Sequence, residues 1–250
     1  MPEISYSFFD FDNTLYKGQS GYLIRDFSIY LDSKEAFDHK RLSQILILVA
    51  SYEGGHLTRY DFAEQIVQAF YEGLTGRTGD QIDEIATEYW RNISKEAWFS
   101  YTHPLLNLIK KYTIPILISG SPIEVLKHIK DRFGFHAIYA SEGNMQSEEF
   151  HGGMHLELAS QSAKKRFMTD LIPILNVDRG TSFAFGDSES DFPLLEAVTP
   201  QNAYLLVEDQ QIRNGKGNKK WNFLEKNIKI IDHVRKRLNS LQTDPGFKRS

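Results

Sequence analysis

The chain has 250 residues, of which 41% are hydrophobic, 13% aromatic and 25% charged, and its formal net charge is −4 at pH 7. These values are typical of a globular protein with one large domain, or with a core and a smaller module. The negative balance excludes the basic surface typical of nucleic-acid-binding proteins. The chain contains no cysteine, which excludes disulfide bonds, a thiolate zinc site and a cysteine nucleophile.

The N-terminal apolar run does not resemble a signal peptide, because it is short and already carries Asp10. The longest apolar stretch elsewhere, residues 45–50, is far shorter than the roughly 20 residues that span a bilayer. We therefore expect a cytoplasmic protein with no membrane partner, and the absence of cysteine suits a reducing compartment. The pattern contains no signal for an oligomeric state.

The first predicted element is a short strand that ends in two acidic residues. Phenylalanine is enriched in residues 5–11, and the Asn13-Thr14 break predicts that this buried strand ends at Asn13. Asp10 and Asp12 leave the same side of an extended chain, and such buried carboxylates are costly without a cation. Mg²⁺ binds one or two carboxylates together with phosphate oxygens. The alternative is an Asx-type turn with solvated acids, and this stretch alone leaves both interpretations open.

A helical block follows the first strand. From Tyr22 to about Trp98 apolar residues recur at helical spacing, with breaks near Ser33, at 54–55 and at 73–79. No strand pattern interrupts the block, which predicts a helical insertion.

The second part of the chain alternates strands with helices. This alternation predicts an α/β fold with a parallel sheet covered on both faces. One predicted helix starts with Ser121 as its N-cap and Pro122 at its first position, and it ends at Gly134. The tail from residue 243 onward is predicted to be frayed. The other predicted elements are strands at 114–118, 137–140, 181–185 and 203–207, an inserted hairpin at 142–158, and helices at 162–174 and 192–198.

Ligands of such sheets bind outside the carboxyl ends of the strands, and polar residues occupy those ends here. Ser119 and Gly120 follow the strand at 114–118 and precede a helix start, a combination that forms an anion site. A simple N-capped helix is the alternative, and it explains Ser121 but leaves Ser119 without a role.

A second polar cluster, residues 186–191, follows the strand at 181–185. Asp187 and Asp191 are four residues apart on a turn that starts a helix, so they can hold a cation directly and through an outer layer of contacts. The alternative is acidic capping of the following helix, which leaves Asp187 unexplained.

A third cluster is the run Lys164-Lys165-Arg166, which opens the helix at 162–174. Cations at a helix N-terminus oppose the helix dipole, so one of them can be held there by an anion. A solvated charge run is the alternative. Periodicity does not separate Lys164 from Lys165.

These four clusters, in this order, resemble the haloacid dehalogenase superfamily. Residues 10–14 resemble its first motif, D-x-D-x-T, and residues 186–191 resemble its fourth, G-D-x-x-x-D. Ser119 resembles the serine of the second motif, and Lys164 resembles the lysine of the third. The wording of the second and fourth motifs is most similar to the phosphoserine-phosphatase-like branch, subfamily IB. The resemblance covers nearly the whole chain.

The resemblance implies a two-part architecture. The expected core is a Rossmann-like α/β unit of three layers with a parallel sheet, made of residues 1–18 and 101–250. The expected insertion, residues 19–100, is an all-helical cap of the C1 type. The cap would close over the site, exclude water and select the substrate.

The resemblance also implies an activity, namely Mg²⁺-dependent hydrolysis of a small phosphorylated metabolite through an aspartyl phosphate. Asp10 would be the nucleophile and Asp12 the general acid and base. Mg²⁺ would bind Asp10, Asp187 and the backbone carbonyl of Asp12, with Asp191 behind them. The implied phosphate-binding and charge-offsetting groups are Thr14, Ser119, Lys164 and the backbone N–H groups of Phe11 and Gly120.

Several alternatives remain open at this stage. The same intermediate supports phosphoryl transfer to another acceptor. Dehalogenation is disfavoured because it does not need Asp12. A non-catalytic phospho-binding module of the receiver type also combines acids, Mg²⁺ and a lysine, but it is much shorter and lacks the helical insertion.

The sequence says less about the identity of the substrate than about the fold or the reaction. Phosphoserine phosphatases usually carry a glutamate shortly after the first motif, whereas residues 18–21 contain no acid, which weakens phosphoserine as the substrate. The cap aromatics can cage a quaternary ammonium or can form the cap core. Arg25, Arg59 and Arg91 are candidates for binding a second anion. The cap aromatics in question are Tyr52, Tyr60, Phe62, Phe70, Tyr71, Tyr89, Trp90 and Trp98.

Overall fold

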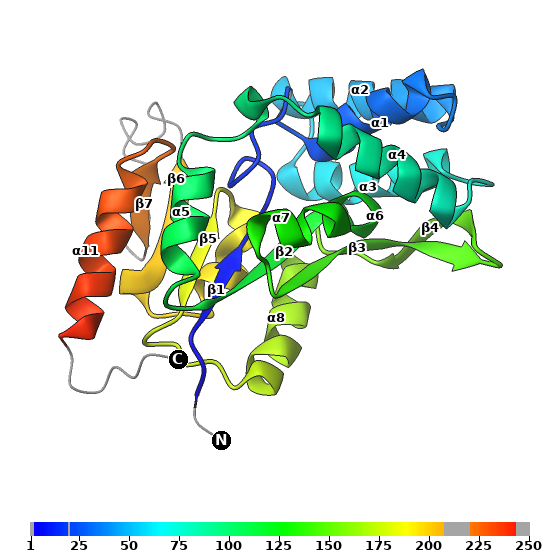
Figure 1. The fold of residues 1–250 in the computed structure, drawn as a ribbon. Helices are drawn as coiled ribbons and strands as arrows, with labels where there is room; N and C mark the ends of the chain where they lie inside the picture. Colours follow the sequence, from blue (N-terminus) through cyan, green and yellow to red (C-terminus); the bar gives the residue numbers. More distant parts are fainter. Residues whose placement is uncertain (1–2, 20, 208–220, 244–250) are drawn as a thin grey trace.

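The computed structural model describes residues 3–19, 21–207 and 221–243, and it is built around one sheet of seven strands (Figure 1). The strand order is β4-β3-β2-β1-β5-β6-β7. β3 and β4 are antiparallel, and every other neighbouring pair is parallel. The predicted α/β fold is therefore confirmed. The strands are β1 (Tyr6–Phe9), β2 (Ile114–Pro122), β3 (Ala137–Gln146), β4 (Glu149–Leu156), β5 (Phe183–Gly186), β6 (Ala203–Val207) and β7 (Asn222–Glu225).

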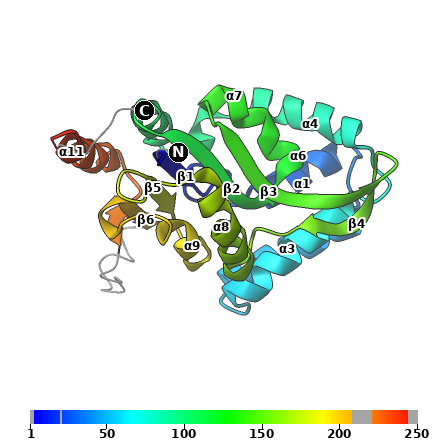
Figure 2. The same cartoon turned by 90° about the horizontal axis from the view of Figure 1, so that it is seen from below.

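Helices cover both faces of the sheet, as Figure 2 shows for α8 and α9 on one side and α7 and α11 on the other. Successive side chains of β1 point to opposite faces, so Phe8 packs with residues of α8 and α9, while Phe9 packs with residues of α5, α7 and α11. The core thus has three layers. These helices are α5 (Thr102–Ile109), α6 (Ile123–Leu126), α7 (Lys130–Phe133), α8 (Gln161–Leu175), α9 (Phe192–Leu195) and α11 (Ile230–Gln242).

The predicted block from Tyr22 to Trp98 is helical, and its helices α1 to α4 lie together at the top right of Figure 1. The side chains of Asp38, Thr58 and Thr78 cap three of them at the N-terminus by accepting a backbone N–H. The breaks fall where the sequence places them. The four helices are α1 (Leu23–Ser33), α2 (His39–Glu53), α3 (Arg59–Gly73) and α4 (Gly79–Asn92).

Apolar packing runs without interruption from this helical block into the sheet. Phe27 of α1 and Phe70 of α3 belong to the same buried cluster as Phe9 of β1 and Leu117 of β2. The division into a core of residues 1–18 and 101–250 and a cap of residues 19–100 stays a prediction. None of the described helices is long and apolar enough to cross a membrane.

Several predicted boundaries are wrong, since the helix predicted at 192–198 ends at Leu195 and the strand predicted at 137–140 continues to Gln146. Two more wrong boundaries lie beside the site. The first strand ends at Phe9 rather than Asn13, because Asn13 adopts a left-handed φ of 57° and its N–H donates to the carbonyl of Tyr16, which turns the chain back. Ser121 is not a helix N-cap, because β2 continues to Pro122 and the Ser121 hydroxyl donates elsewhere. The tail is described only to residue 243, so most of the predicted fraying lies outside the described residues.

The helix predicted to run from 121 to 134 is interrupted. Its middle, Lys127–Ile129, is a 3₁₀ turn that separates α6 from α7. Its end is as predicted, because Gly134 has a φ of 72°, which glycine adopts readily. Further 3₁₀ turns are Lys95–Ala97, Glu189–Asp191 and Pro200–Asn202.

Candidate active site

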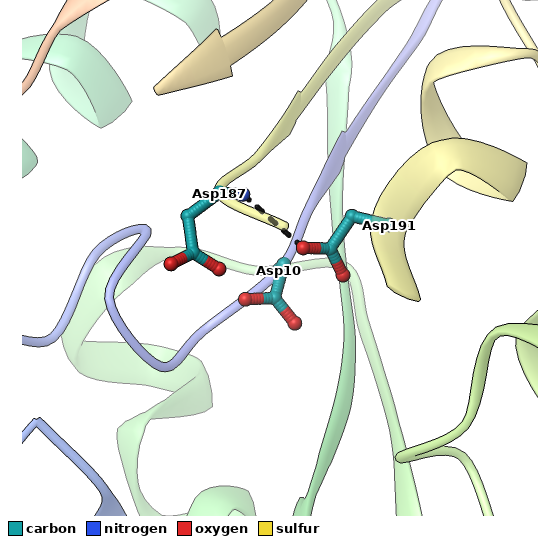
Figure 3. A group of neighbouring side chains, drawn as sticks. All are labelled: Asp10, Asp187 and Asp191. Carbon is teal, nitrogen blue, oxygen red and sulfur yellow. Dashed lines mark hydrogen bonds between the residues drawn. The ribbon is translucent and has the colours of Figure 1, made fainter. Parts of the chain in front are cut away.

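Three acidic side chains meet at the carboxyl ends of β1 and β5 (Figure 3). Asp10 directly follows β1, Asp187 directly follows β5, and Asp191 closes the 3₁₀ turn after it. One carboxylate oxygen of each lies within 4.8 Å of those of the other two. β1 and β5 are hydrogen-bonded neighbours, with Phe9 opposite Phe185, so residues 177 positions apart are brought together by strand register.

Asp191 is fully buried and organises the turn that carries Asp187. Its Oδ2 accepts hydrogen bonds from the N–H of Asp187 at 3.1 Å, the N–H of Ser188 at 3.1 Å and the Ser188 hydroxyl at 3.0 Å. The turn needs Gly186, because a Cβ there would lie 2.4 Å from the Cβ of Asp191. Asp191 thus fixes the direction in which Asp187 leaves the sheet.

Lys164 joins the group from the first turn of α8. Its ammonium donates to Asp10 Oδ1 at 2.8 Å and to Asp191 Oδ1 at 2.5 Å, and the lysine is 2% exposed. Lys165 is exposed, so the geometry separates the two lysines that periodicity could not. Although burial raises the pKa of Asp191, the adjacent Lys164 charge holds that pKa below its usual value. The cation is therefore held at the helix N-terminus by two anions.

Asp10 is ionised only at a cost in this environment. Burial and the neighbouring Asp191 raise the pKa of Asp10 to about 8, and the Lys164 charge offsets only part of that shift. The Thr14 hydroxyl donates to Asp10 Oδ2 at 3.1 Å, which orients the carboxylate. The three acids are paired with two lysines, Lys164 and Lys226, so one negative charge remains for a further cation to offset.

The residues present fit a hard cation. Asp187 Oδ1 is buried and has no hydrogen-bond partner within the ranges that the structure describes, while Oδ2 lies 3.4 Å from the ammonium of Lys226. An open buried carboxylate oxygen beside two further carboxylates is an all-oxygen donor set, which suits Mg²⁺. Asp10, Asp187 and Asp191 are the side chains that could hold the ion.

The Asp12 side chain lies outside this acid group. Its Oδ1 accepts the N–H of Leu23 at 2.7 Å, and its Oδ2 accepts the Ser121 hydroxyl at 2.5 Å. Burial raises the pKa of Asp12 to about 6, although both hydrogen bonds oppose that shift. Asp12 is thus positioned by the cap helix α1 and by β2. In the expected metal site only its backbone carbonyl has a role.

Ser121 was missed as a site residue because the sequence assigns its hydroxyl to a helix cap. The signal that could have found it is its place two residues after Ser119, on the same side of an extended strand. Ser119 is buried, and its hydroxyl accepts the N–H of Ser121 at 3.0 Å. Gly120 is required for close packing, because a Cβ there would lie 2.5 Å from the Cα of Ala159.

A cavity opens between these groups and helices α1 and α3. Asp10, Asp12 and Lys164 line its floor together with Gly120 and Ser121. The candidates for nucleophile, proton-transfer group and lysine therefore face one space. The expected phosphate-binding residues Phe11 and Thr14 are buried and are not among the residues that line it.

Arg59 reaches the same cavity from the first position of α3. Its guanidinium donates to the Ser188 hydroxyl at 3.3 Å and lies 5.7 Å from the ring centroid of Tyr52. Of the three arginines that the sequence offers, it is the one that lines this cavity among the described residues. A cap cation thus stands beside the turn that carries Asp187.

Lys226 was missed altogether. It directly follows β7, whose four residues are too short for a recognisable pattern, and it reaches Asp187 from the outer part of the sheet. Its position at a strand end is the signal that could have found it.

Comparisons with known proteins agree with this geometry. The haloacid dehalogenase-like hydrolase family matches residues 7–196, well over half of the chain. A comparison with curated proteins finds no match.

Solved structures with similar folds are 12–19% identical in sequence to this chain, so the similarity shows the fold alone. One is a protein of unknown function from Bordetella pertussis Tohama I, with a TM-score of 0.69, 19% identity and coverage of 90% of this chain and 100% of that chain. Another is a phospho-aspartyl intermediate analogue of phosphoserine phosphatase, with a TM-score of 0.63, 12% identity and coverage of 94% and 99%. A third is cytosolic 5'-nucleotidase IIIB bound to cytidine, with a TM-score of 0.62, 12% identity and coverage of 94% and 87%. The family match and the grouping of all four motifs around one cavity lead to one conclusion: the chain belongs to the haloacid dehalogenase-like hydrolase family.

Proposed function

We propose that the protein is a Mg²⁺-dependent phosphatase that hydrolyses a small phosphomonoester through a phosphoryl group on Asp10. The observation that carries the proposal is the meeting of Asp10 with Asp187, Asp191 and Lys164, beside a cavity that Asp10 and Lys164 line. Asp12 favours phosphoryl chemistry over dehalogenation. A halide leaves as a stable anion, whereas an alkoxide needs a proton from a nearby acid.

In the first step a carboxylate oxygen of Asp10 attacks the phosphorus atom, and the bond from phosphorus to the alcohol oxygen breaks. Protonated Asp12 gives its proton to that leaving oxygen, so the alcohol departs neutral. Lys164 and Thr14 hold the Asp10 carboxylate in place through its two oxygens. The products of this step are the alcohol and an aspartyl phosphate.

In the second step Asp12, now ionised, takes a proton from a water molecule whose oxygen attacks the phosphorus. The bond from phosphorus to Asp10 breaks, and inorganic phosphate leaves. The hydrogen bonds from the Leu23 N–H and the Ser121 hydroxyl hold the Asp12 carboxyl group in one position during both steps. The cycle returns both acids to their starting protonation states.

Asp10, Asp187 and the backbone carbonyl of Asp12 would hold Mg²⁺, with Asp191 stabilising the arrangement. The bound ion supplies positive charge that offsets these carboxylates and the phosphate oxygens. Lys164 and the backbone N–H groups of Phe11 and Gly120 supply the remaining offset, with Ser119 supporting the loop. Without such compensation a phosphate dianion would be repelled by the acids.

The names of two proteins with similar folds, phosphoserine phosphatase and cytosolic 5'-nucleotidase IIIB, agree with a phosphatase. We further propose that the reaction takes place in the cytoplasm, that residues 19–100 act as the substrate-selecting cap, and that no nucleic acid or membrane takes part.

The test is release of inorganic phosphate from a panel of phosphorylated metabolites. We expect turnover with Mg²⁺, none in excess chelator, recovery when Mg²⁺ is restored, and none for a folded Asp10→Asn variant. Added alcohols that lower phosphate release while gaining a phosphoryl group would show transfer instead of hydrolysis. Turnover by Asp10→Asn, or full activity in chelator, would contradict the proposal.

A further inference from the structure

The wall that the cap contributes to the cavity is apolar. α3 presents a stripe at positions i, i+1, i+4 and i+5, and the start of α1 completes the wall. All but one of these residues are buried, and Tyr22 is half-buried. The wall consists of Tyr22, Leu23, Ile24, Phe62, Ala63, Ile66 and Val67.

This wall offers no partner for a positively charged substrate group. Among the described residues, the acids that line the cavity are Asp10 and Asp12. Asp10 is paired with Lys164, and Asp12 accepts two hydrogen bonds. An ammonium seated against the wall would lose its hydration without gaining a counter-ion, which is costly.

An aromatic cage for a quaternary ammonium is also absent from the described part of the cavity. Phe62 is stacked on Tyr52, with ring centroids 4.4 Å apart, and the Tyr22 ring meets Phe62 edge-on at 5.3 Å. The guanidinium of Arg59 lies over the Tyr52 ring and would repel a second cation. The cluster is therefore packed on itself and already holds a positive group.

Most of the other aromatic cap residues pack in the interior. Phe70, Tyr71, Tyr89, Trp90 and Trp98 are each at most 7% exposed and belong to the main buried cluster. This outcome favours the core-packing interpretation of the cap aromatics over the cage.

We propose that the substrate is a phosphomonoester whose alcohol part is an uncharged, apolar group seated against Ile66 and Phe62. The phosphoryl end faces Asp10 and Lys164 on the floor of the cavity. Arg59 stands at that same end, because it donates to Ser188, next to Asp187 in the chain. Its charge therefore complements the phosphoryl group rather than the alcohol. This inference rests on the proposed function and adds the substrate class.

The first test is a substrate series with wild-type protein and Mg²⁺. Ethyl, butyl and hexyl phosphate have similar leaving groups and differ in apolar length. We expect kcat/KM to rise about fourfold for each methylene that reaches the wall, since that is the rate factor for one buried CH₂. Phosphoethanolamine and phosphoserine, which carry an ammonium, should be poorer substrates than butyl phosphate.

The outcomes of this series are distinguishable. If kcat/KM does not change along the alkyl series, or if the ammonium-bearing esters are hydrolysed faster, the proposed substrate class is wrong. The proposed phosphatase activity would not be affected by that result. No phosphate release from any ester in Mg²⁺ would overturn the proposed function and the wall together.

The second test compares two isoleucines. Ile66→Ala removes apolar surface from the cavity wall, whereas Ile82→Ala removes the same atoms from α4, where the buried side chain does not line the cavity. We expect Ile66→Ala to lower the ratio of kcat/KM for hexyl over ethyl phosphate about fourfold or more, and Ile82→Ala to leave it unchanged. Ile66→Val should give a smaller loss in the same direction if the alanine variant folds poorly. Equal ratios in all variants would contradict the proposal.

Discussion

The ammonium of Lys164 offsets negative charge on two acidic side chains of the site. It bonds to Asp10 and Asp191 while buried at the N-terminus of α8, where the helix dipole alone would disfavour it. A buried ion group of this kind stabilises a protein little compared with apolar residues, but removing one partner leaves the others uncompensated. The lysine therefore matters for folding as well as for the phosphate binding that we propose.

Replacing this lysine should lower both activity and stability. For Lys164→Met we expect loss of turnover and a decrease in the free energy of unfolding of about 3–5 kcal/mol, measured by urea denaturation in chelator. Lys165→Met is the matched control, because its side chain is exposed one position away, and it should change neither quantity much. Equal effects of the two substitutions would contradict the assignment of Lys164 to the site.

At the scale of elements, the β3–β4 hairpin ties the cap to the core. Its strand β4 and the turn before it exchange three backbone hydrogen bonds with the loop between α3 and α4, and they place Phe150 against Tyr71. The Tyr71 hydroxyl lies 2.6 Å from the carbonyl oxygen of Ser141 on β3 and 2.8 Å from Oε2 of Glu124 on α6, and it can donate its single proton to either. Cap, hairpin and α6 therefore meet around one tyrosine, away from the acid group.

Glu124 makes this junction sensitive to pH. Burial raises the pKa of Glu124 above its usual value of 4.5, although Tyr71 and the N–H of Gly143 oppose that shift. The folded protein therefore binds more protons than the unfolded chain, so the stability from this group is present at low pH and is lost as pH rises through the folded pKa.

Glu124→Gln should remove this loss, because a glutamine keeps the shape without ionising. The difference in unfolding free energy between Glu124→Gln and wild type should grow as pH rises above 4.5, measured by urea denaturation across pH 4 to 8. Glu84→Gln, an exposed change on α4, is the control and should follow wild type. A constant difference across this range would show that Glu124 is not coupled to folding.

At the scale of the whole molecule, the fold brings distant acids to one edge of the sheet, and a cation should stabilise that arrangement. A ligand that binds only the folded state adds about 2.7 kcal/mol at one hundred times its Kd. Adding Mg²⁺ should therefore raise the Tm of wild type, and chelator should reverse the change.

Two aspartates separate specific binding from a general salt effect. Asp187→Asn should abolish the Mg²⁺-dependent rise in Tm, because it removes the carboxylate with the open buried oxygen. Asp170→Asn, an exposed change on α8, should keep it. A rise that survives in Asp187→Asn would place the ion elsewhere.

Much of this arrangement could be predicted from the sequence, because apolar periodicity locates the strand ends and parallel strands direct their ends to one edge. Asp10 and Asp187 are predictable on that basis, whereas periodicity does not separate Lys164 from Lys165, and only the burial of Lys164 in the structure does. The hydrogen bond between Ser121 and Asp12 is not, since it depends on how far β2 extends beside the loop after β1. Arg59 approaches through the packing of the cap, which has no signature in the local pattern.

The most direct test of the whole account is to trap the phosphoryl group during turnover. Wild-type protein and Asp12→Asn are mixed with substrate and Mg²⁺, quenched with acid, digested and analysed by mass spectrometry. We expect the mass of one phosphoryl group on the peptide that contains Asp10 in the wild type, slower approach to that level in Asp12→Asn because Asp12 serves both steps, and none in Asp10→Asn. Phosphorylation of another residue, or phosphate release by Asp10→Asn at the wild-type rate, would contradict the account.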